Sequence, residues 1–190
     1  ATGGKMTITS GVGFHGSSGD LLLYTSDAGT SGVSGMVVLS SGDATTGNSG
    51  ALYVGSGDAF IGRGGSVYVT VGSGNSGSGG EIVISSGKST LGNSGAMFIG
   101  TDTATVGRGG SVYVTVGSGN SGSGGEVVLS AGTSASATGG KMTITSGVGV
   151  LGSSGDLVIY TSDAGTSGSS GLVALSSGDA TTGNSGALYV

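Results

Sequence analysis

One stretch, RGGSVYVTVGSGNSGSGGE, occurs twice without a change, first at Arg63–Glu81 and again at Arg108–Glu126. Within it lies a shorter unit, made of small residues, a five-residue apolar alternation and a Gly/Ser turn. This unit recurs about every fifteen residues along the chain. A fixed short period is typical of solenoids and arrays, in which each unit packs on its neighbours. The repetition therefore constrains the fold more than any single motif does.

The repeat boundaries follow from the glycines and the apolar columns. We number positions from the first residue of each repeat, and the repeats begin at Thr2, Ser17, Val33, Asn48, Arg63, Ser78, Asn93, Arg108, Ser123, Thr138, Ser153, Ser169 and Asn184. All are of equal length except the second and the eleventh, which are longer by one residue, and the last, which is cut short. Position 3 is Gly in every repeat, and positions 5 and 7 are Val, Leu, Ile or Met in every repeat.

Positions 5 and 7 predict where a core would lie. Residues two apart in a strand point to the same face, so Val67 and Val69 and their equivalents are expected to form an inner wall. Position 9, with small residues such as Ser10 and Ala131, is expected to continue that wall into a narrowing corner. Position 12 is always small, which favours a second, shorter strand over positions 11 to 14. The Gly and Ser content and the lack of helical periodicity argue against helix.

The sequence thus predicts an all-β fold, a single-stranded parallel β-solenoid, also called a flattened β-helix. It would have about 15 residues per rung and about 12–13 rungs, and it would form one continuous domain over residues 1–190. At ~4.8 Å per rung, the expected rod is roughly 60 Å long.

A longer period lies above the repeats. Residues 1–54 match residues 137–190 at 47 of 54 positions, which makes a super-repeat with an offset of 136 positions. The first block begins with the last residue of a repeat, and the second stops inside an expected strand. We therefore interpret 1–190 as a window of a longer array, and we expect end-to-end association at the unpaired strand edges.

Composition limits the classes of protein and of partner. The 47 Gly among 190 residues do not indicate collagen, since there is no Pro, and 35% hydrophobic with 8% charged residues disfavours a disordered chain. A net charge of −5 with five scattered basic residues gives no surface for nucleic acid. No apolar run reaches the roughly 18 residues of a membrane helix, so we expect no membrane insertion. There is no signal-peptide pattern, and without cysteines the redox compartment cannot be read.

Two motifs that suggest chemistry have simpler explanations. Gly72, Gly74 and Gly77 match a dinucleotide-binding spacing, but another expected strand follows where that motif requires a helix. His15 is the only histidine, and Leu151 replaces it in the second block, which indicates a packing position. No acid, base and pocket converge. We therefore expect no enzyme, no catalytic residue, no cofactor and no metal centre.

An acidic column leaves two interpretations open. Asp27, Asp43 and Asp58 share position 11 in consecutive repeats, next to the turn. Asp in a turn commonly hydrogen-bonds nearby backbone, which would make the column structural. Stacked carboxylates can also bind Ca²⁺ weakly, although the nonapeptide of calcium-binding β-rolls is absent.

Position 6 is expected to face outward, yet it is apolar in most repeats. A contiguous exposed apolar stripe is typical of an interface. We predict an interface formed by Val38, Tyr53, Tyr68, Val83, Phe98, Tyr113 and Val128. Lateral association of copies through this stripe is the first expectation, and ordinary β-propensity on a solvated strand is the alternative.

The segments GGSVYVTVGSGNSG, GGEVVLSAG and SGALYVGSGDA resemble the Gly/Ser/Thr-rich, short-rung β-solenoid repeats of large secreted or surface structural proteins. The resemblance covers the whole chain, is compositional, and implies a structural protein of an extracellular or cell-surface filament or matrix. Self-association is the expected interaction, with glycans or other matrix polymers as further candidate partners. The chain also resembles short-rung antifreeze solenoids, so an ice-binding or polysaccharide-binding surface is the alternative. Only Thr7/Thr9 and Thr143/Thr145 match the outward Thr rows of those proteins.

Overall fold

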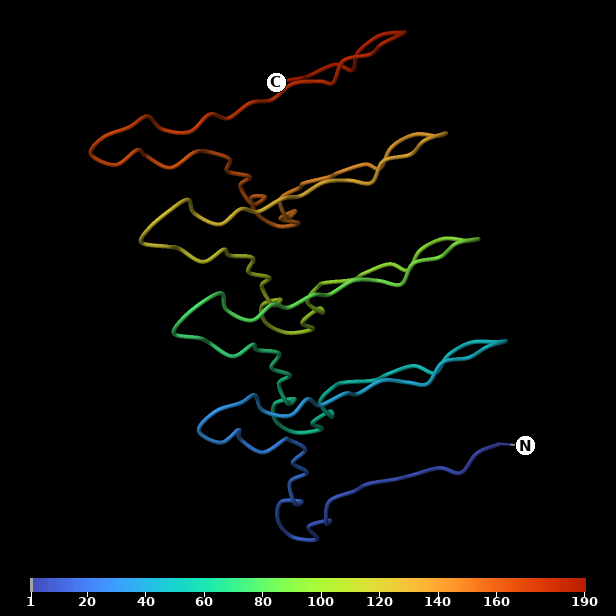
Figure 1. Ribbon diagram of the computed structural model, residues 1–190. Helices are drawn as coiled ribbons and strands as arrows, with labels where there is room; N and C mark the ends of the chain where they lie inside the picture. Colours follow the sequence, from blue (N-terminus) through green and yellow to red (C-terminus); the bar gives the residue numbers. More distant parts are fainter. Residues whose placement is uncertain (1) are drawn as a thin grey trace. The chain divides into compact units, whose positions relative to one another are not determined.

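The computed structural model describes residues 2–190, and over these residues it contains neither helix nor strand. The chain alternates between extended stretches and three-residue bends, and Figure 1 accordingly shows a continuous tube without coils or arrows. The chain forms two units, Ala1–Met97 and Phe98–Val190. Each unit contains the same succession of stretches and bends, so the two are described by the same rules.

The bends follow the sequence repeats. They lie at residues 14–16, 30–32, 45–47, 60–62, 75–77, 90–92, 105–107, 120–122, 135–137, 150–152, 166–168 and 181–183. Each bend covers the last three residues of a repeat, and the spacing between bends lengthens by one wherever the repeat does. The local backbone is thus set by the repeat ends, where Gly, Ser, Thr and Asn gather.

The predicted fold class is wrong. The described residues form no strand, so the parallel β-solenoid with about 12–13 stacked rungs is not present. A solenoid requires hydrogen bonds between residues that lie one full rung apart in the sequence. The hydrogen bonds between repeats instead join residues eight to ten apart, such as Gly19 N with Gly11 O and Thr25 Oγ1 with Gly35 O.

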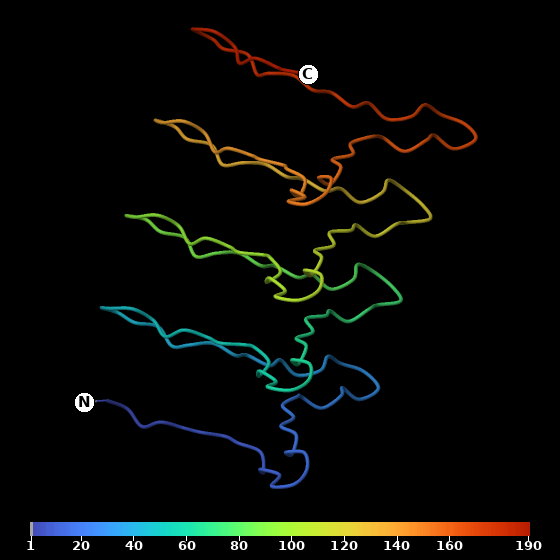
Figure 2. The same cartoon turned by 180° about the vertical axis from the view of Figure 1, so that it is seen from behind.

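These short separations show why the prediction failed. The chain folds back on itself around each bend, and the end of one repeat therefore lies against the start of the next. The extended stretches before and after the bend at 45–47 run side by side in Figures 1 and 2. In the second unit, the stretches around 135–137 do the same. The contacts between repeats are therefore made by a local reversal at the bends and not by a rising ladder of rungs.

The predicted core wall is also wrong. No side chain is buried among residues 2–190, and position 7 is as open to solvent as most of the chain: Val69 is 71% exposed. Position 5 is covered somewhat more, with Val67 at 54%. Because one stretch lies beside only one neighbour near each bend, it has no second layer against which to bury an apolar face.

Candidate functional site

The contacts that the structure does make gather at the bends. In each of the twelve bends, the Gly at position 3 of one repeat lies against the residue at position 9 of the repeat before it. We call these two residues a corner pair. A Cβ added to Gly35 would lie 3.0 Å from Thr25 Cγ2, and one added to Gly80 would lie 2.9 Å from Val71 Cγ1. At pairs such as these, position 3 is glycine because the position-9 side chain occupies the space of a Cβ, whereas at Gly50 and Gly186 a Cβ would lie at an ordinary contact distance of 3.6 to 3.7 Å.

Burial also concentrates at the corner pairs. Only four described residues are half-buried and all the others are exposed; three of the four, Ser41, Thr161 and Ser177, are position-9 residues. The fourth is Gly149, which comes directly before the bend at 150–152. In the described part of this chain, side chains are thus covered most at the corner pairs.

Hydrogen bonds close eight of the twelve corner pairs, in two ways. In the first, a hydroxyl at position 9 donates to the carbonyl oxygen of the position-3 Gly: Thr25 to Gly35 at 3.0 Å, Ser56 to Gly65 at 2.8 Å, Thr101 to Gly110 at 3.2 Å and Thr161 to Gly171 at 3.2 Å. In the second, the N–H of the position-3 Gly donates to the carbonyl of position 10: Gly19 to Gly11, Gly95 to Gly87, Gly140 to Gly132 and Gly155 to Gly147, at 2.8 to 3.0 Å. Every position-9 Thr uses the first form.

The bend itself is made in three ways. Eight of the twelve bends end in a glycine with positive φ, namely Gly32, Gly47, Gly62, Gly77, Gly107, Gly122, Gly168 and Gly183. In two others, the glycine at position 12 (Gly13 or Gly149) lies so close to backbone carbonyls that no Cβ fits. In the remaining two, a serine at position 12 accepts the N–H of the last residue. These bonds are Gly92 N to Ser89 Oγ at 2.9 Å and Ala137 N to Ser134 Oγ at 3.0 Å.

The third form explains the one repeat that does not end in glycine. Among the twelve bends, only that at 135–137 ends in a residue with a Cβ, Ala137. Its backbone does not enter the left-handed region, because the Ser134 hydroxyl holds the bend instead. At the bends 90–92 and 135–137, a serine at position 12 therefore takes the place of a positive-φ glycine at the end of the repeat.

The seven residues of the predicted interface stripe are all exposed. Their exposed fractions run from 70% at Val38 and Val128 to 94% at Phe98. No strand connects them in the described part of the chain, so no ladder brings them into one row. Val38, Tyr53, Tyr68 and Val83 belong to the first unit, and Phe98, Tyr113 and Val128 belong to the second. Their joint role as an interface remains a prediction.

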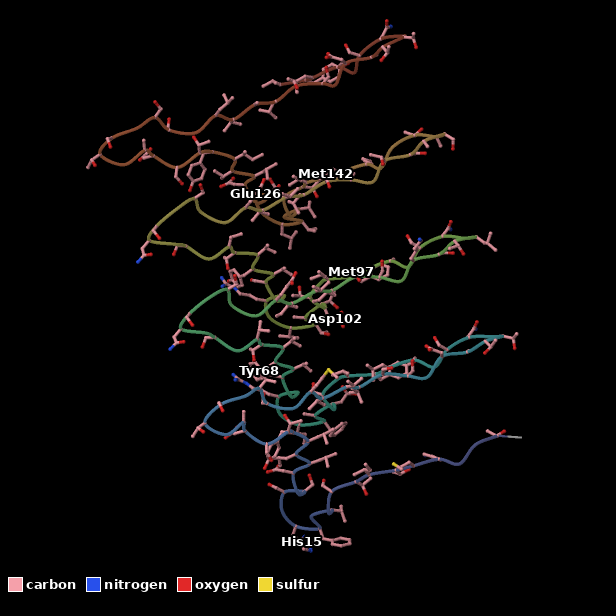
Figure 3. All side chains as sticks on the ribbon, viewed as in Figure 1. His15, Tyr68, Met97, Asp102, Glu126 and Met142 are labelled. Atoms are coloured by element: carbon pink, nitrogen blue, oxygen red, sulfur yellow. The ribbon has the colours of Figure 1, made fainter. Side chains whose placement is uncertain are left out.

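The other sequence candidates lie apart from one another. Residues 2–190 contain no group of three or more His, Cys, Asp or Glu side chains that could hold a metal ion, so Asp27, Asp43 and Asp58 are not brought together as a calcium site. His15 lies at the bend 14–16, and Figure 3 shows it away from Tyr68 in the same unit. No pocket is present among residues 2–190. The described part of the chain also holds no helix long and apolar enough to cross a membrane.

The corner pair is the feature that the sequence interpretation missed. The invariant Gly at position 3 and the short side chains at position 9 were both visible as columns. Their partnership was hidden because the two residues belong to different repeats. A comparison of columns across repeat boundaries, at a separation of nine or ten residues, would have found it.

Comparisons of this chain with protein-family models, with curated proteins and with solved structures found no match.

Proposed function

We propose that this chain is a structural protein of an extracellular or cell-surface fibre or matrix, and that it acts by associating with further copies of itself rather than by catalysis. The observation that carries the proposal is the uncovered surface. The chain exposes 19,007 Å². A compact monomer of 17.5 kDa exposes roughly 7,900 Å², less than half as much.

Much of that surface is apolar and regularly spaced. Large apolar side chains are exposed in every repeat, including Met97, Val112 and Ile144 at positions 5 and 7. Burying one such side chain fully is worth about 1.5–3 kcal/mol, and the single chain leaves part of this gain unrealised. Another copy carries the same side chains at the same spacing, so it can cover them in register.

The charge distribution favours the same kind of partner. The chain has five basic and ten acidic residues among 190, and a net charge of −5 offers little repulsion between copies. The extracellular or surface setting is part of the proposal and rests on the likeness of its Gly/Ser/Thr-rich segments to secreted structural proteins.

Sedimentation velocity over a range of concentrations, combined with negative-stain microscopy, tests this function. We expect the sedimenting mass to rise with concentration and elongated assemblies to appear. A protein that stays monomeric at every concentration would contradict the proposal. Retention on a polysaccharide column or thermal hysteresis by such a monomer would replace it with the corresponding binding function.

A further inference from the structure

We propose that copies of this chain contact one another through the duplicated segment SVYVTV, residues 66–71 and 111–116, which pairs backbone to backbone with the same segment of a second copy. This inference rests on the proposed self-association and assigns the residues that make it. The partner is therefore another molecule of this chain.

The composition of the segment suits self-pairing. Four of its six residues are β-branched and one is tyrosine; in the first copy the β-branched residues are Val67, Val69, Thr70 and Val71. The segment contains no charged residue, no Gly and no Pro. Short uncharged stretches of this composition stack on identical copies of themselves, with like side chains in contact.

Other stretches at the same place in the repeat are less suited. Lys5, Asp20 and Glu81 put a charge directly before the apolar alternation in their repeats, and ALYVGS and AMFIGT contain a glycine. MVVLS at 36–40 is uncharged, but its counterpart at 172–176 is LVALS, so the two are not identical. SVYVTV occurs in two unchanged copies. Whichever copy of the segment pairs with another, the two paired sequences are identical.

The backbone of the segment is available. The described residues make four backbone–backbone hydrogen bonds, and none of them involves residues 66–71 or 111–116. Tyr68 is 85% and Tyr113 is 87% exposed, and of the apolar side chains in each stretch only the last, Val71 at 47% and Val116 at 45%, is more than half covered. An extended, uncovered run of N–H and C=O groups is a template for another strand.

Corner pairs fix both ends of each segment. Directly before residues 66–71, the Gly65 carbonyl accepts the Ser56 hydroxyl at 2.8 Å, and the last residue, Val71, lies against Gly80. The second copy is held in the same way, by the bond from Thr101 to Gly110 and the contact of Val116 with Gly125. Held extended at both ends, the segment loses less conformational freedom when it pairs.

A proline variant tests the inference. The change Val69→Pro with Val114→Pro removes one N–H from each copy of the segment. The matched control is Ile8→Pro with Ile144→Pro, the same position in KMTITS, which is also duplicated but begins with lysine. We expect the first variant to lose sedimenting assemblies and their diffraction spacing of about 4.7–4.8 Å, and the control to keep both. Equal loss or equal retention in the two variants would overturn the assignment.

A spin label supplies a second measurement, which does not depend on how a proline variant folds. The chain has no cysteine, so Tyr68→Cys carries a single label. In assembled material we expect strong dipolar broadening or exchange narrowing of its spectrum, and none from a label at Thr7→Cys. An unbroadened spectrum at position 68 in assemblies overturns the assigned contact but leaves self-association standing. If the unmodified chain does not assemble at all, the proposed function itself fails.

Discussion

Thr25 Oγ1 donates a 3.0 Å hydrogen bond to the carbonyl oxygen of Gly35, and in the second block of the super-repeat Thr161 makes the equivalent 3.2 Å bond to Gly171. In both cases the donor lies in one of the two longer repeats and the acceptor lies in the repeat that follows. The bond holds the bend between them closed. It is the hydrogen bond that the structure records across the bends at 30–32 and 166–168.

Replacing Thr25 by Val removes this bond and keeps the shape of the side chain. Val71 and Val116 occupy the same position in other repeats, so the substitution introduces no new clash. We expect the free energy that closes the bend to fall by about 0.5–1.5 kcal/mol. The carbonyl ¹³C shift of Gly35 should move upfield in NMR spectra of dilute protein. Thr70→Val is the control, and an unchanged Gly35 shift would show that the hydroxyl does not hold this corner.

The bend at 120–122 depends on the absence of a side chain at Gly125. A Cβ there would overlap Val116 Cγ1, so Gly125→Ala should force the two stretches apart. A second change, Val116→Ala, should restore the bend, because it removes Cγ1 and the remaining neighbours of the new Cβ, Gly117 O and the Cβ of residue 116, lie at 3.8 Å. Spin labels at Thr115→Cys and Glu126→Cys would report the separation by pulsed EPR. A distance that stays the same in Gly125→Ala, or that is not restored in the double variant, would contradict the corner pair.

The last residue of a repeat should tolerate alanine where serine occupies position 12, and should not tolerate it where that last residue has a positive φ. Gly47 has φ of +115°, and an L-residue in the left-handed region is disfavoured by roughly 1–2 kcal/mol. Gly92 is held by Ser89 and does not have a positive φ. We therefore expect Gly47→Ala to disturb its bend and Gly92→Ala to leave its bend intact. Residual dipolar couplings of the flanking amides measure both, and equal responses would refute the difference between the two kinds of bend.

Self-association should respond to temperature more than to salt. Apolar burial weakens on cooling, whereas attraction between exposed charges is screened by salt. With only 8% charged residues, the chain has few ion pairs to lose. We expect assemblies to shrink between room temperature and the cold, and to change little between low and physiological salt. Light scattering at fixed protein concentration measures both effects, and the opposite pattern would indicate association through charges.

The repeat ends could be read from the sequence, but the path of the chain could not. The bends cover the last three residues of each repeat, where the Gly-rich ends such as Asn75–Gly77 already indicated turns. The alternation at positions 5 and 7 is the same for a rung that rises by one strand and for a stretch that folds back. Periodicity alone therefore could not distinguish the two.

The path of the chain depends on the sizes of the two residues of each corner pair, which lie in neighbouring repeats. Gly35 leaves room for Thr25, and the Thr25 hydroxyl reaches the Gly35 carbonyl. Once that local reversal forms, no second layer covers Val67 or Val69, and the expected core is missing. The predicted interface stripe consists of apolar residues that are expected to face outward. The structure shows them exposed, but the single row assigned to them depended on the strand ladder.

The corner pairs also bear on how a gene of this kind can lengthen. Every hydrogen bond recorded for residues 2–190 joins residues no more than ten apart. A duplication or deletion that begins and ends at equivalent points of two repeats therefore leaves the hydrogen bonds of the remaining repeats intact. It needs no compensating substitution elsewhere. The stretch repeated at Arg63–Glu81 and Arg108–Glu126 has the form that such an unequal exchange leaves behind. The number of repeats can therefore change during evolution without a change in the geometry of each bend.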